Sequence, residues 1–256
     1  MVYREAAADG AKEAIMSIFH NWEPRSWEWI FGRLGMPTAS NFPRVMTPSK
    51  RGASSQSETY RNQLNGEWIT GEPTEAYQSQ FMEHGIERED DAFAAYETLT
   101  EVETSPGGYW TTNDKQVGAS PDRTVGGNGL LELKCPGIAR QVETALKGSE
   151  IAKDHICQLQ GQLYVCEREW VDLFSYHPAL IVRPIRVYRD EEFIADLKRH
   201  LDDFITLLLR DRERLENEYG PFVRAGATAP PTIPERDAIT DADVDAILAA
   251  RRKQQE

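Results

Sequence analysis

Apolar residues along the chain follow two kinds of pattern, and each kind predicts its own type of element. Where they recur every three or four positions, the helical period favours an amphipathic helix. The clearest case is 190–218, where one stripe contains Phe193, Leu197, Leu201, Phe204, Leu207 and Leu208. Further helices are expected at 57–66, 75–97, 138–147 and 153–167.

Shorter apolar or alternating runs predict strands instead, because the side chains of a strand point to opposite faces in turn. These runs lie near 98–104, 108–112, 115–120, 129–134, 169–176 and 180–188. Helices and strands therefore alternate along most of the chain. That order is typical of the α/β class.

The ends of the chain have simpler patterns. Residues 4–20 alternate alanine with charge and then become apolar, which predicts an amphipathic helix. Residues 224–235 have the proline-rich composition of a linker. A short helix is expected in 236–256, with Val244, Ile247 and Leu248 on one face. We therefore expect one domain at 1–223, a linker and a C-terminal helix.

Composition narrows the possible functions. The 256 residues suit one domain with a sizeable core, and no apolar run is long enough to span a membrane. The first residues lack the apolar region of a signal peptide. The cysteines are only three, an odd number, and lack the spacing of a metal finger, which indicates buried thiols in a reducing compartment. A net charge of −13 weighs against nucleic-acid binding. However, residues 26–61 carry five basic side chains against two acidic ones, which leaves a local basic face.

Asp122, Glu132 and Lys134 carry the most informative chemistry. On the expected strand 129–134, Glu132 and Lys134 point to one side and Leu133 to the core, with Asp122 near the end of the preceding strand. Two carboxylates beside an ammonium can hold a hard divalent cation such as Mg²⁺. The lysine would then orient a water molecule or offset charge on a phosphate. A hairpin with a solvated charged face is the alternative interpretation of these three residues.

The spacing Pro-Asp, nine residues, then Glu-x-Lys resembles the PD-(D/E)XK nuclease signature. Four ordered blocks together resemble the YqaJ-type viral recombinases, the family of the phage lambda exonuclease. These blocks are 33–40, 85–97, 120–136 and 158–164. The resemblance implies a restriction-endonuclease-like core, in which helices flank a central mixed sheet. It also implies a helical segment before that core and a helical tail after it.

The resemblance further implies an Mg²⁺-dependent 5′→3′ exonuclease that digests one strand of duplex DNA and leaves 3′ overhangs for recombination. Its metal ligands would be Glu89, Asp122, Glu132 and the Leu133 carbonyl, with two ions and Mn²⁺ as a substitute. Gln160 would be the catalytic amide of the fourth block, although Gln158 and Gln162 flank it.

Further residues match family positions that contact DNA. Arg33, Ser40 and Ser120 would bind the terminal 5′-phosphate. Basic residues near the duplex groove correspond to Lys50 and Arg51, and the apolar wedge at the end base pair corresponds to Met82. The sequence departs from the family where glycine usually follows Ser-Pro-Asp, because Arg123 stands there.

The family also implies partners and a setting. These are double-stranded DNA ends, a ring-shaped homotrimer, a single-strand annealing protein, and a phage or prophage protein in the cytoplasm of a bacterial host. Two rival functions stay open. One is another nuclease of the same superfamily, such as an endonuclease or a repair-complex nuclease. The other is a non-catalytic module that binds DNA ends or proteins.

Overall fold

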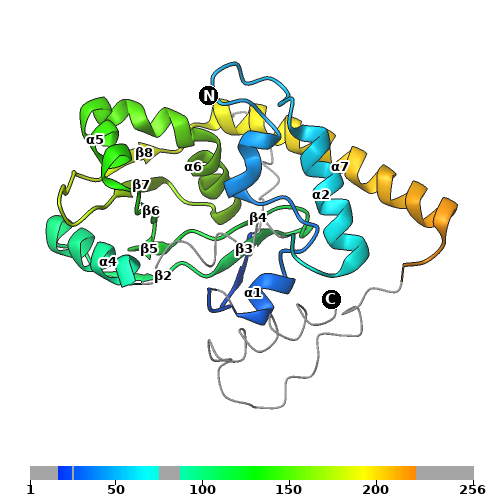
Figure 1. Cartoon of the computed structure of the whole chain (residues 1–256), viewed down its shortest axis with the longest axis horizontal. Helices are drawn as coiled ribbons and strands as arrows, with labels where there is room; N and C mark the ends of the chain where they lie inside the picture. The colour runs from blue at the N-terminus through cyan, green and yellow to red at the C-terminus, as the bar shows by residue number, and fades with distance from the viewer. Residues whose placement is uncertain (1–16, 25, 75–86, 223–256) are drawn as a thin grey trace, which may run out of the picture.

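The computed structural model describes residues 17–24, 26–74 and 87–222, and these residues form two sheets with helices around them (Figure 1). The expected helix and linker in 224–256 and the start of the helix expected from residue 75 lie outside these ranges. In the described part of the chain, no helix has both the length and the apolar character needed to cross a membrane.

The larger sheet has five strands in the order β2-β5-β6-β7-β8. Their bounds are β2 Thr104–Pro106, β5 Arg123–Val125, β6 Gly129–Lys134, β7 Trp170–Ser175 and β8 Ile185–Tyr188. β6 and β7 are parallel, and the other neighbours are antiparallel, so this is the mixed sheet that the family resemblance implies.

The parallel pair needs a crossover connection, and helices supply it. The connection comprises α5 Ile138–Lys147, the 3₁₀ helix η2 Gly148–Ile151 and α6 Ala152–Cys166. The predicted helix 138–147 and strand 129–134 are confirmed at both ends, and the helix expected at 153–167 differs by one residue at each end. Leu130 and Leu131 are both fully buried although they point to opposite faces, because the sheet is covered on both sides.

The smaller sheet has the order β1-β3-β4, with β1 Ser17–His20, β3 Tyr109–Thr112 and β4 Gly118–Ala119. β1 corrects one expectation, because residues 17–20 are a strand and not the end of a helix over 4–20. β1 pairs antiparallel with β3, and the ring of Phe19 lies 4.8 Å from that of Trp110. Pairing with a distant strand thus overrides the local helical pattern.

Further helices of the described residues lie around the sheets. They are α1 Trp27–Phe31, the 3₁₀ helix η1 Ala39–Arg44, α2 Ser57–Thr70, α4 Glu87–Thr100 and α7 Glu191–Tyr219. The apolar stripe of α7 is confirmed at Phe193, Leu197, Leu201, Phe204 and Leu208, which are buried in the main core, whereas Leu207 is exposed. α2 packs along α7, and the Tyr60 and Phe204 rings are stacked between them.

Other boundaries differ from the sequence pattern in the region before the site. The strand expected at 98–104 is largely helix, because α4 continues to Thr100 and β2 begins only at Thr104. The run 115–120 contains only the two residues of β4, and β5 has no counterpart among the expected strands. This irregular stretch leads the chain from the small sheet to the large one, and Asp122 lies at that transition.

Candidate active site

Glu132 and Lys134 lie on the same face of β6, as strand alternation predicts. Glu132 is 4% exposed, and its Oε1 accepts a hydrogen bond from Lys134 Nζ at 2.5 Å. Leu133 points the other way, into a cluster that includes Val125 and Phe174. The sheet therefore places a carboxylate and an ammonium together at the carboxyl end of a buried strand.

Asp122 is held against β6 by two main-chain contacts. Its Oδ2 accepts from the Leu133 amide at 2.6 Å, and its own amide donates to the Leu131 carbonyl at 3.2 Å. The residue does not end a strand. It stands directly before β5, which runs antiparallel to β6. The two strands thus bring Asp122 and Glu132 to the same region from opposite directions.

The electrostatics of this pair favour a bound cation. Asp122 as a whole residue is exposed to solvent, but its Oδ2 faces the Leu133 amide of β6 and accepts a hydrogen bond from it. Loss of solvation, followed by the charge of Glu132, raises the pKa of Asp122 to about 8. A cation would relieve this repulsion. Desolvation lowers the pKa of Lys134, but the charge and hydrogen bond of Glu132 outweigh it, so this pKa lies above its ordinary value. Lys134 is therefore a charged donor at neutral pH.

Two glutamines of α6 complete the surroundings of Glu132. Gln158 Nε2 donates to Oε1 and Gln162 Nε2 donates to Oε2, each at 2.6 Å. They share a face because they are four residues apart on a helix. Gln158 Oε1 also accepts from Lys134 Nζ at 3.4 Å.

The structure places the amide of Gln160, the residue expected to be catalytic, apart from this group. It lies on the other side of α6, where its Nε2 donates to the Tyr188 carbonyl and its Oε1 accepts from the Asp190 amide. Both amide atoms therefore join α6 to the start of α7. The structure does not bring Gln160 to the carboxylates, and the amides that reach Glu132 are its neighbours on the same helix.

Glu89, on α4, acts on this site through its charge but does not complete a set of metal ligands. Its charge adds to the causes that raise the pKa of Asp122 and of the Cys135 thiol. Among the residues that the structure describes, no group of three or more His, Cys, Asp or Glu side chains is arranged to hold a metal ion. The oxygen donors at Asp122 and Glu132 nevertheless fit a hard cation in chemical type. Burial raises the pKa of Cys135 to about 11, so this thiol stays protonated at neutral pH.

Arg33 and Ser120, two of the expected phosphate ligands, are joined by an unexpected residue. The Arg33 guanidinium lies 4.0 Å from the ring centroid of Trp29, and Trp29 Nε1 donates to Ser120 Oγ at 3.0 Å. Ser40 is exposed, and its hydroxyl is 3.4 Å from that of Thr38. Thr38 forms a parallel bridge with Gly118, so the chain segments carrying Ser40 and Ser120 leave that bridge in the same direction.

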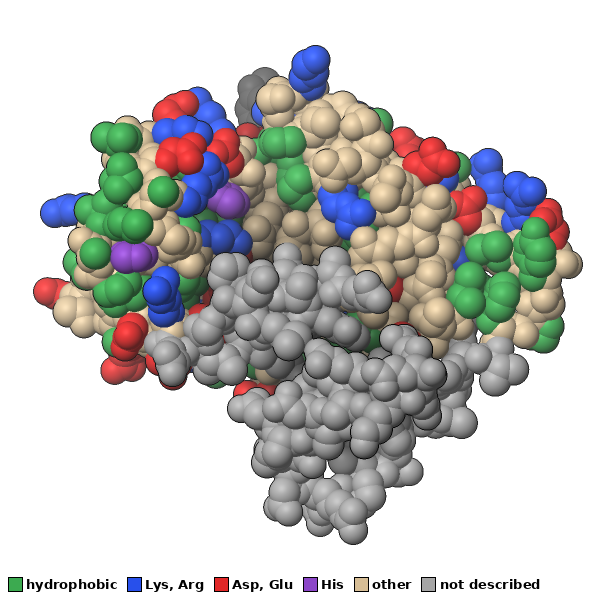
Figure 2. All heavy atoms as spheres, in the orientation of Figure 1, with side chains coloured by type: hydrophobic (Ala, Val, Ile, Leu, Met, Phe, Trp, Pro, Cys, Tyr) green, Lys and Arg blue, Asp and Glu red, His purple; other side chains and the backbone are tan. Residues whose placement is uncertain are grey.

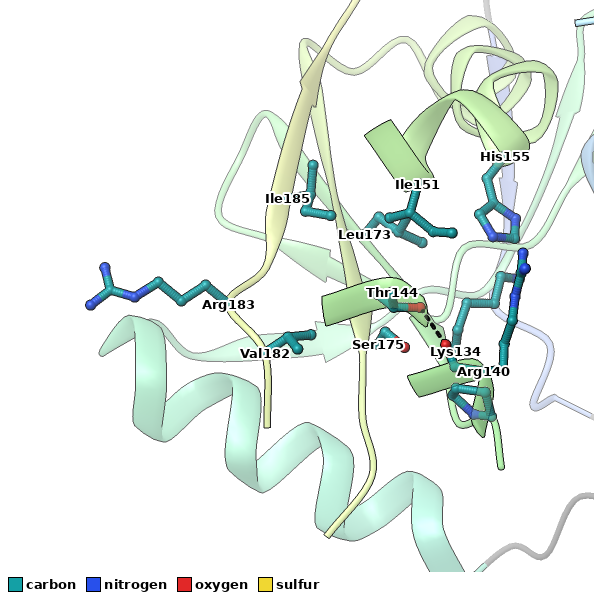
Figure 3. A pocket seen from close by; sticks show the side chains of 11 residues that line it. Lys134, Arg140, Thr144, Ile151, His155, Leu173, Ser175, Val182, Arg183 and Ile185 are labelled. Carbon is teal, nitrogen blue, oxygen red and sulfur yellow. Dashed lines mark hydrogen bonds between the residues drawn. The ribbon is translucent and has the colours of Figure 1, made fainter. Parts of the chain in front are cut away.

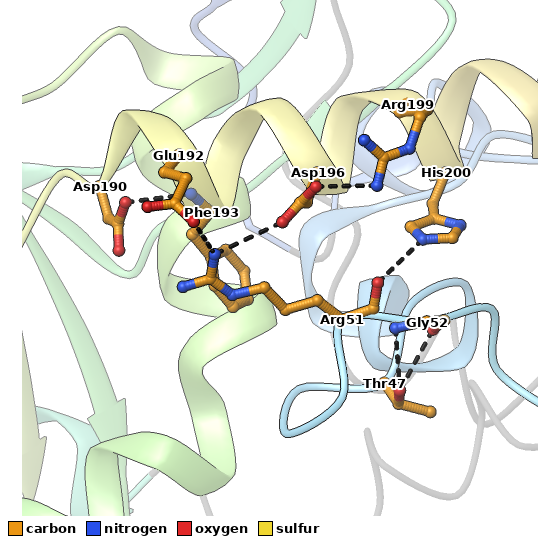
Figure 4. Close-up of polar contacts among 9 residues, drawn as sticks. All are labelled: Thr47, Arg51, Gly52, Asp190, Glu192, Phe193, Asp196, Arg199 and His200. Carbon is orange, nitrogen blue, oxygen red and sulfur yellow. Dashed lines mark hydrogen bonds and ion pairs between the residues drawn. The ribbon is translucent and has the colours of Figure 1, made fainter.

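The other expected DNA contacts have different surroundings. Arg51 forms ion pairs with Glu192 and Asp196 of α7, and its guanidinium lies over the Phe193 ring (Figure 4). Arg51 therefore fastens its loop to α7. Lys50 is exposed, and Met82 lies outside the described residues. The Arg123 guanidinium lies 4.0 Å from the Phe93 ring centroid, so packing against α4 accounts for its position.

A pocket of about 130 Å³ opens beside the candidate site (Figure 3). It lies where β6 and β7 end, and its rim includes Lys134, Arg140 and His155. The sequence pattern does not single out Arg140, His155, Gln162 or Trp29 as site residues. The spacing of Gln158 and Gln162 is the one signal that points to a shared face.

The mixed sheet and its Asp, Glu and Lys arrangement define a PD-(D/E)XK nuclease fold. Within that class, the chain belongs to the YqaJ-like viral recombinase family, because a model of that domain matches residues 28–169. The identification from the four sequence blocks is therefore confirmed.

Solved structures agree with this assignment. A crystal structure of LHK-Exo in complex with dAMP is 32% identical, with a TM-score of 0.65 over 75% of this chain and 97% of LHK-Exo. A second crystal structure, of the alkaline exonuclease LHK-Exo from Laribacter hongkongensis, is 31% identical with a TM-score of 0.64 and the same coverage. Comparison with curated proteins found no match. The chain is thus homologous to alkaline exonucleases.

Proposed function

We propose that this protein is an Mg²⁺-dependent 5′→3′ exonuclease that digests one strand of duplex DNA from its end and leaves a 3′ overhang for phage-type recombination. The observation that carries the proposal is the contact set of Glu132, which accepts from Lys134, Gln158 and Gln162. A solvated hairpin face would not bury a carboxylate among three donors. LHK-Exo supports the substrate class, because one of its structures holds dAMP, a deoxynucleoside monophosphate.

The carboxylates Glu89, Asp122 and Glu132, with the Leu133 carbonyl, would hold two Mg²⁺ ions, and Mn²⁺ would substitute. Bound metal supplies Lewis-acid activation of the scissile phosphate and a water molecule of lowered pKa. Gln158 and Gln162 hold both oxygens of Glu132 in place, so the carboxylate does not need to reorient when a cation arrives.

Lys134 is the charged donor nearest to these oxygens. Its Nζ contacts Glu132 and Gln158. The amine is protonated at neutral pH, because its pKa lies above the ordinary value. In the proposed reaction it donates a hydrogen bond to the scissile phosphate and offsets the charge that develops there. Gln160 is left out of this mechanism, because its amide is used between α6 and α7.

The 5′→3′ direction of digestion would follow from the group of Arg33, Trp29 and Ser120. Stacking on Trp29 presents the planar guanidinium of Arg33, and the Trp29 hydrogen bond to Ser120 connects that group to the chain leading into Asp122. A terminal 5′-phosphate bound there, with Ser40 at the exposed edge, would place the first internucleotide bond at the carboxylates. A homotrimeric ring, a single-strand annealing partner and a phage or prophage origin belong to the same proposal through the family.

The decisive experiment digests linear duplexes with 5′-phosphate or 5′-hydroxyl ends, in Mg²⁺ and in EDTA, with label at either end. We expect Mg²⁺-dependent release of mononucleotides from the 5′ end and faster digestion of phosphorylated ends. Covalently closed circular duplex is the control and should stay intact. Cleavage of the circle would favour an endonuclease, and binding of ends without hydrolysis would favour a non-catalytic module.

A further inference from the structure

The pocket beside Lys134 has no part in the chemistry proposed above. Its rim carries Lys134, Arg140 and His155, and its floor includes the apolar side chains of Leu173 and Ile185. Figure 3 shows Lys134, Arg140 and His155 gathered on one side of the pocket, whereas Arg183 points away from it. The rim is therefore a set of hydrogen-bond donors next to the candidate catalytic lysine.

His155 lies on the same side of the pocket as Lys134 and Arg140. Desolvation lowers its pKa, and the charges of Lys134 and Arg140 lower it further, which outweighs the opposite effect of Glu132 and Asp154. The imidazole is therefore neutral at neutral pH and carries one N–H donor. A neutral donor beside two cationic ones suits an oxyanion.

Arg140 already has acidic partners, and these do not exhaust it. Its NH1 contacts Glu143 and its NH2 contacts Asp154. Both carboxylates are about two-fifths exposed, at 41% and 43%, so water screens these pairs. A guanidinium has five N–H donors, which leaves further donors for a ligand in the pocket.

The backbone around the pocket also favours an anion. Lys134 and Ser175 end the parallel strands β6 and β7, and the carboxyl ends of parallel strands are where α/β sheets commonly bind ligands. His155 and Ile151 lie near the N-terminus of α6, where the helix dipole is positive. The cationic rim thus lies at a position that the fold itself favours.

Contacts and short sequence steps connect the proposed phosphate group to the pocket. Arg33 contacts Trp29, Trp29 contacts Ser120, and Asp122, two residues further on, accepts from the Leu133 amide next to Lys134 on the pocket rim. If the 5′-terminal phosphate lies at Arg33 and the scissile phosphate at the carboxylates, the strand continues past Lys134. The next phosphate along it would then meet Arg140 and His155.

We propose that Arg140 and His155, beside Lys134, form a phosphate-binding subsite for the first phosphodiester on the 3′ side of the scissile bond. This subsite rests on the proposed exonuclease function. Its ligand chemistry is a phosphate ester, and the released deoxynucleoside monophosphate is the second possible source. Binding there would hold the retained strand while the terminal nucleotide leaves.

The first test uses the unaltered protein and two linear 5′-phosphorylated duplexes. One carries an uncharged methylphosphonate at the second linkage from the 5′ end, and the other carries it at a linkage far inside the duplex. We expect release of the first nucleotide to be about ten-fold slower from the former, as for loss of a charge-assisted hydrogen bond. Equal release from both would overturn the subsite, while the digestion itself would still establish the exonuclease.

The second test compares Arg140→Gln and His155→Ala with the matched control Lys153→Gln. Lys153 lies on the same helix as His155, is 73% exposed and pairs with Glu150. We expect Arg140→Gln to raise KM for duplex DNA about ten-fold with little change in kcat, and to reduce the salt slope of binding by about one. The control should change neither. Unchanged KM in both pocket variants would overturn the proposal.

Inhibition by a deoxynucleoside monophosphate separates the two sources of phosphate. If the strand occupies the subsite, Arg140→Gln weakens duplex binding and leaves this inhibition unchanged. If the released nucleotide occupies it, the inhibition weakens in parallel with KM. Absence of any hydrolysis by the unaltered protein would instead contradict the proposed function itself.

Discussion

Three side-chain donors converge on Glu132, and two of them come from glutamines one turn apart on α6. A buried carboxylate needs such donors, because an uncompensated charge is costly to desolvate. The donors also fix both oxygens in one orientation. Gln158 and Gln162 therefore act on the reaction through the position of Glu132.

The glutamines give a matched pair of variants on one helix. We expect Gln162→Ala to lower kcat by about ten-fold or more, since a hydrogen bond to a charged group contributes ~1.5–3 kcal/mol. Gln160→Ala removes contacts to residues 188 and 190, and it should lower the melting temperature while kcat is retained. Steady-state kinetics and thermal unfolding measure both. If Gln160→Ala lowered kcat and Gln162→Ala lowered only the melting temperature, Gln160 would be the catalytic amide.

The charge on Asp122 predicts a stability change in metal-free protein. Its folded pKa of about 8 lies above that of an exposed aspartate, so ionisation between about pH 4 and 8 costs stability. Because Asp122 is exposed, solvent screens much of this cost, so in EDTA Asp122→Asn should melt only roughly 2 °C higher than the unaltered protein at pH 9. The difference should shrink towards pH 4, where the aspartate is protonated.

The same variant should be inactive with Mg²⁺, because an amide is a weaker cation ligand than a carboxylate. Thermal unfolding across pH, with and without Mg²⁺, measures the first effect, and duplex digestion measures the second. A variant that melts below the unaltered protein at pH 9 in EDTA would contradict the repulsion between Asp122 and Glu132.

Single residues differ in how far the sequence determines them. Strand alternation is local, so it places Glu132 and Lys134 on one face without knowledge of the rest of the fold. The choice among Gln158, Gln160 and Gln162 requires the rotation of α6 relative to β6, which only packing sets. Likewise, the contact of Trp29 with Ser120 joins residues far apart in sequence, and no local pattern predicts it.

Helices and strands show the same contrast: local patterns predict some of them, and others depend on pairing between distant segments. The helix 138–147 and the strand 129–134 are predicted to the residue, because turn signals bound each of them. β1 is mistaken for helix, since a four-residue strand exists only through its pairing with β3. β5 is missed because its three residues acquire strand geometry between β2 and β6.

The contact between the Arg51 loop and α7 gives a prediction at this scale. Arg51 pairs with Glu192 and Asp196, and its guanidinium lies 5.2 Å from the Phe193 ring centroid. These pairs are partly exposed, so Arg51→Ala should cost only about 1 kcal/mol, and added salt should reduce the difference. Lys50→Ala, an exposed neighbour of equal charge, is the control and should leave unfolding unchanged.

Denaturant unfolding at low and high salt measures this cost, and DNA binding is followed in parallel. If Arg51→Ala leaves stability unchanged but weakens DNA binding, Arg51 contacts the duplex groove, as the family resemblance implies. Loss of stability alone would make Arg51 a structural residue of the loop.

At the scale of the whole molecule, the net charge differs from the local charge at the pocket. The chain carries a net charge of −13, yet Lys134 and Arg140 lie together on the pocket rim. An acidic body repels DNA except where such groups lie together. The sequence indicates the uneven charge, but the fold brings Arg140 to Lys134 through the crossover between β6 and β7.

The last prediction concerns the C-terminal part of the chain, which carries none of the proposed site residues. The described fold reaches Phe222, whose ring lies 5.7 Å from that of Trp68 on α2. A chain ending at Ile233 keeps this contact, all of α7 and every proposed ligand, so it should fold and retain nuclease activity. Residues 236–256, with Val244, Ile247 and Leu248, would instead serve a partner such as the annealing protein. Thermal unfolding, digestion of linear duplex and a partner-binding assay compare the two chains. A truncated chain that melts markedly lower would place these residues in the core or in a subunit interface, contrary to the docking role.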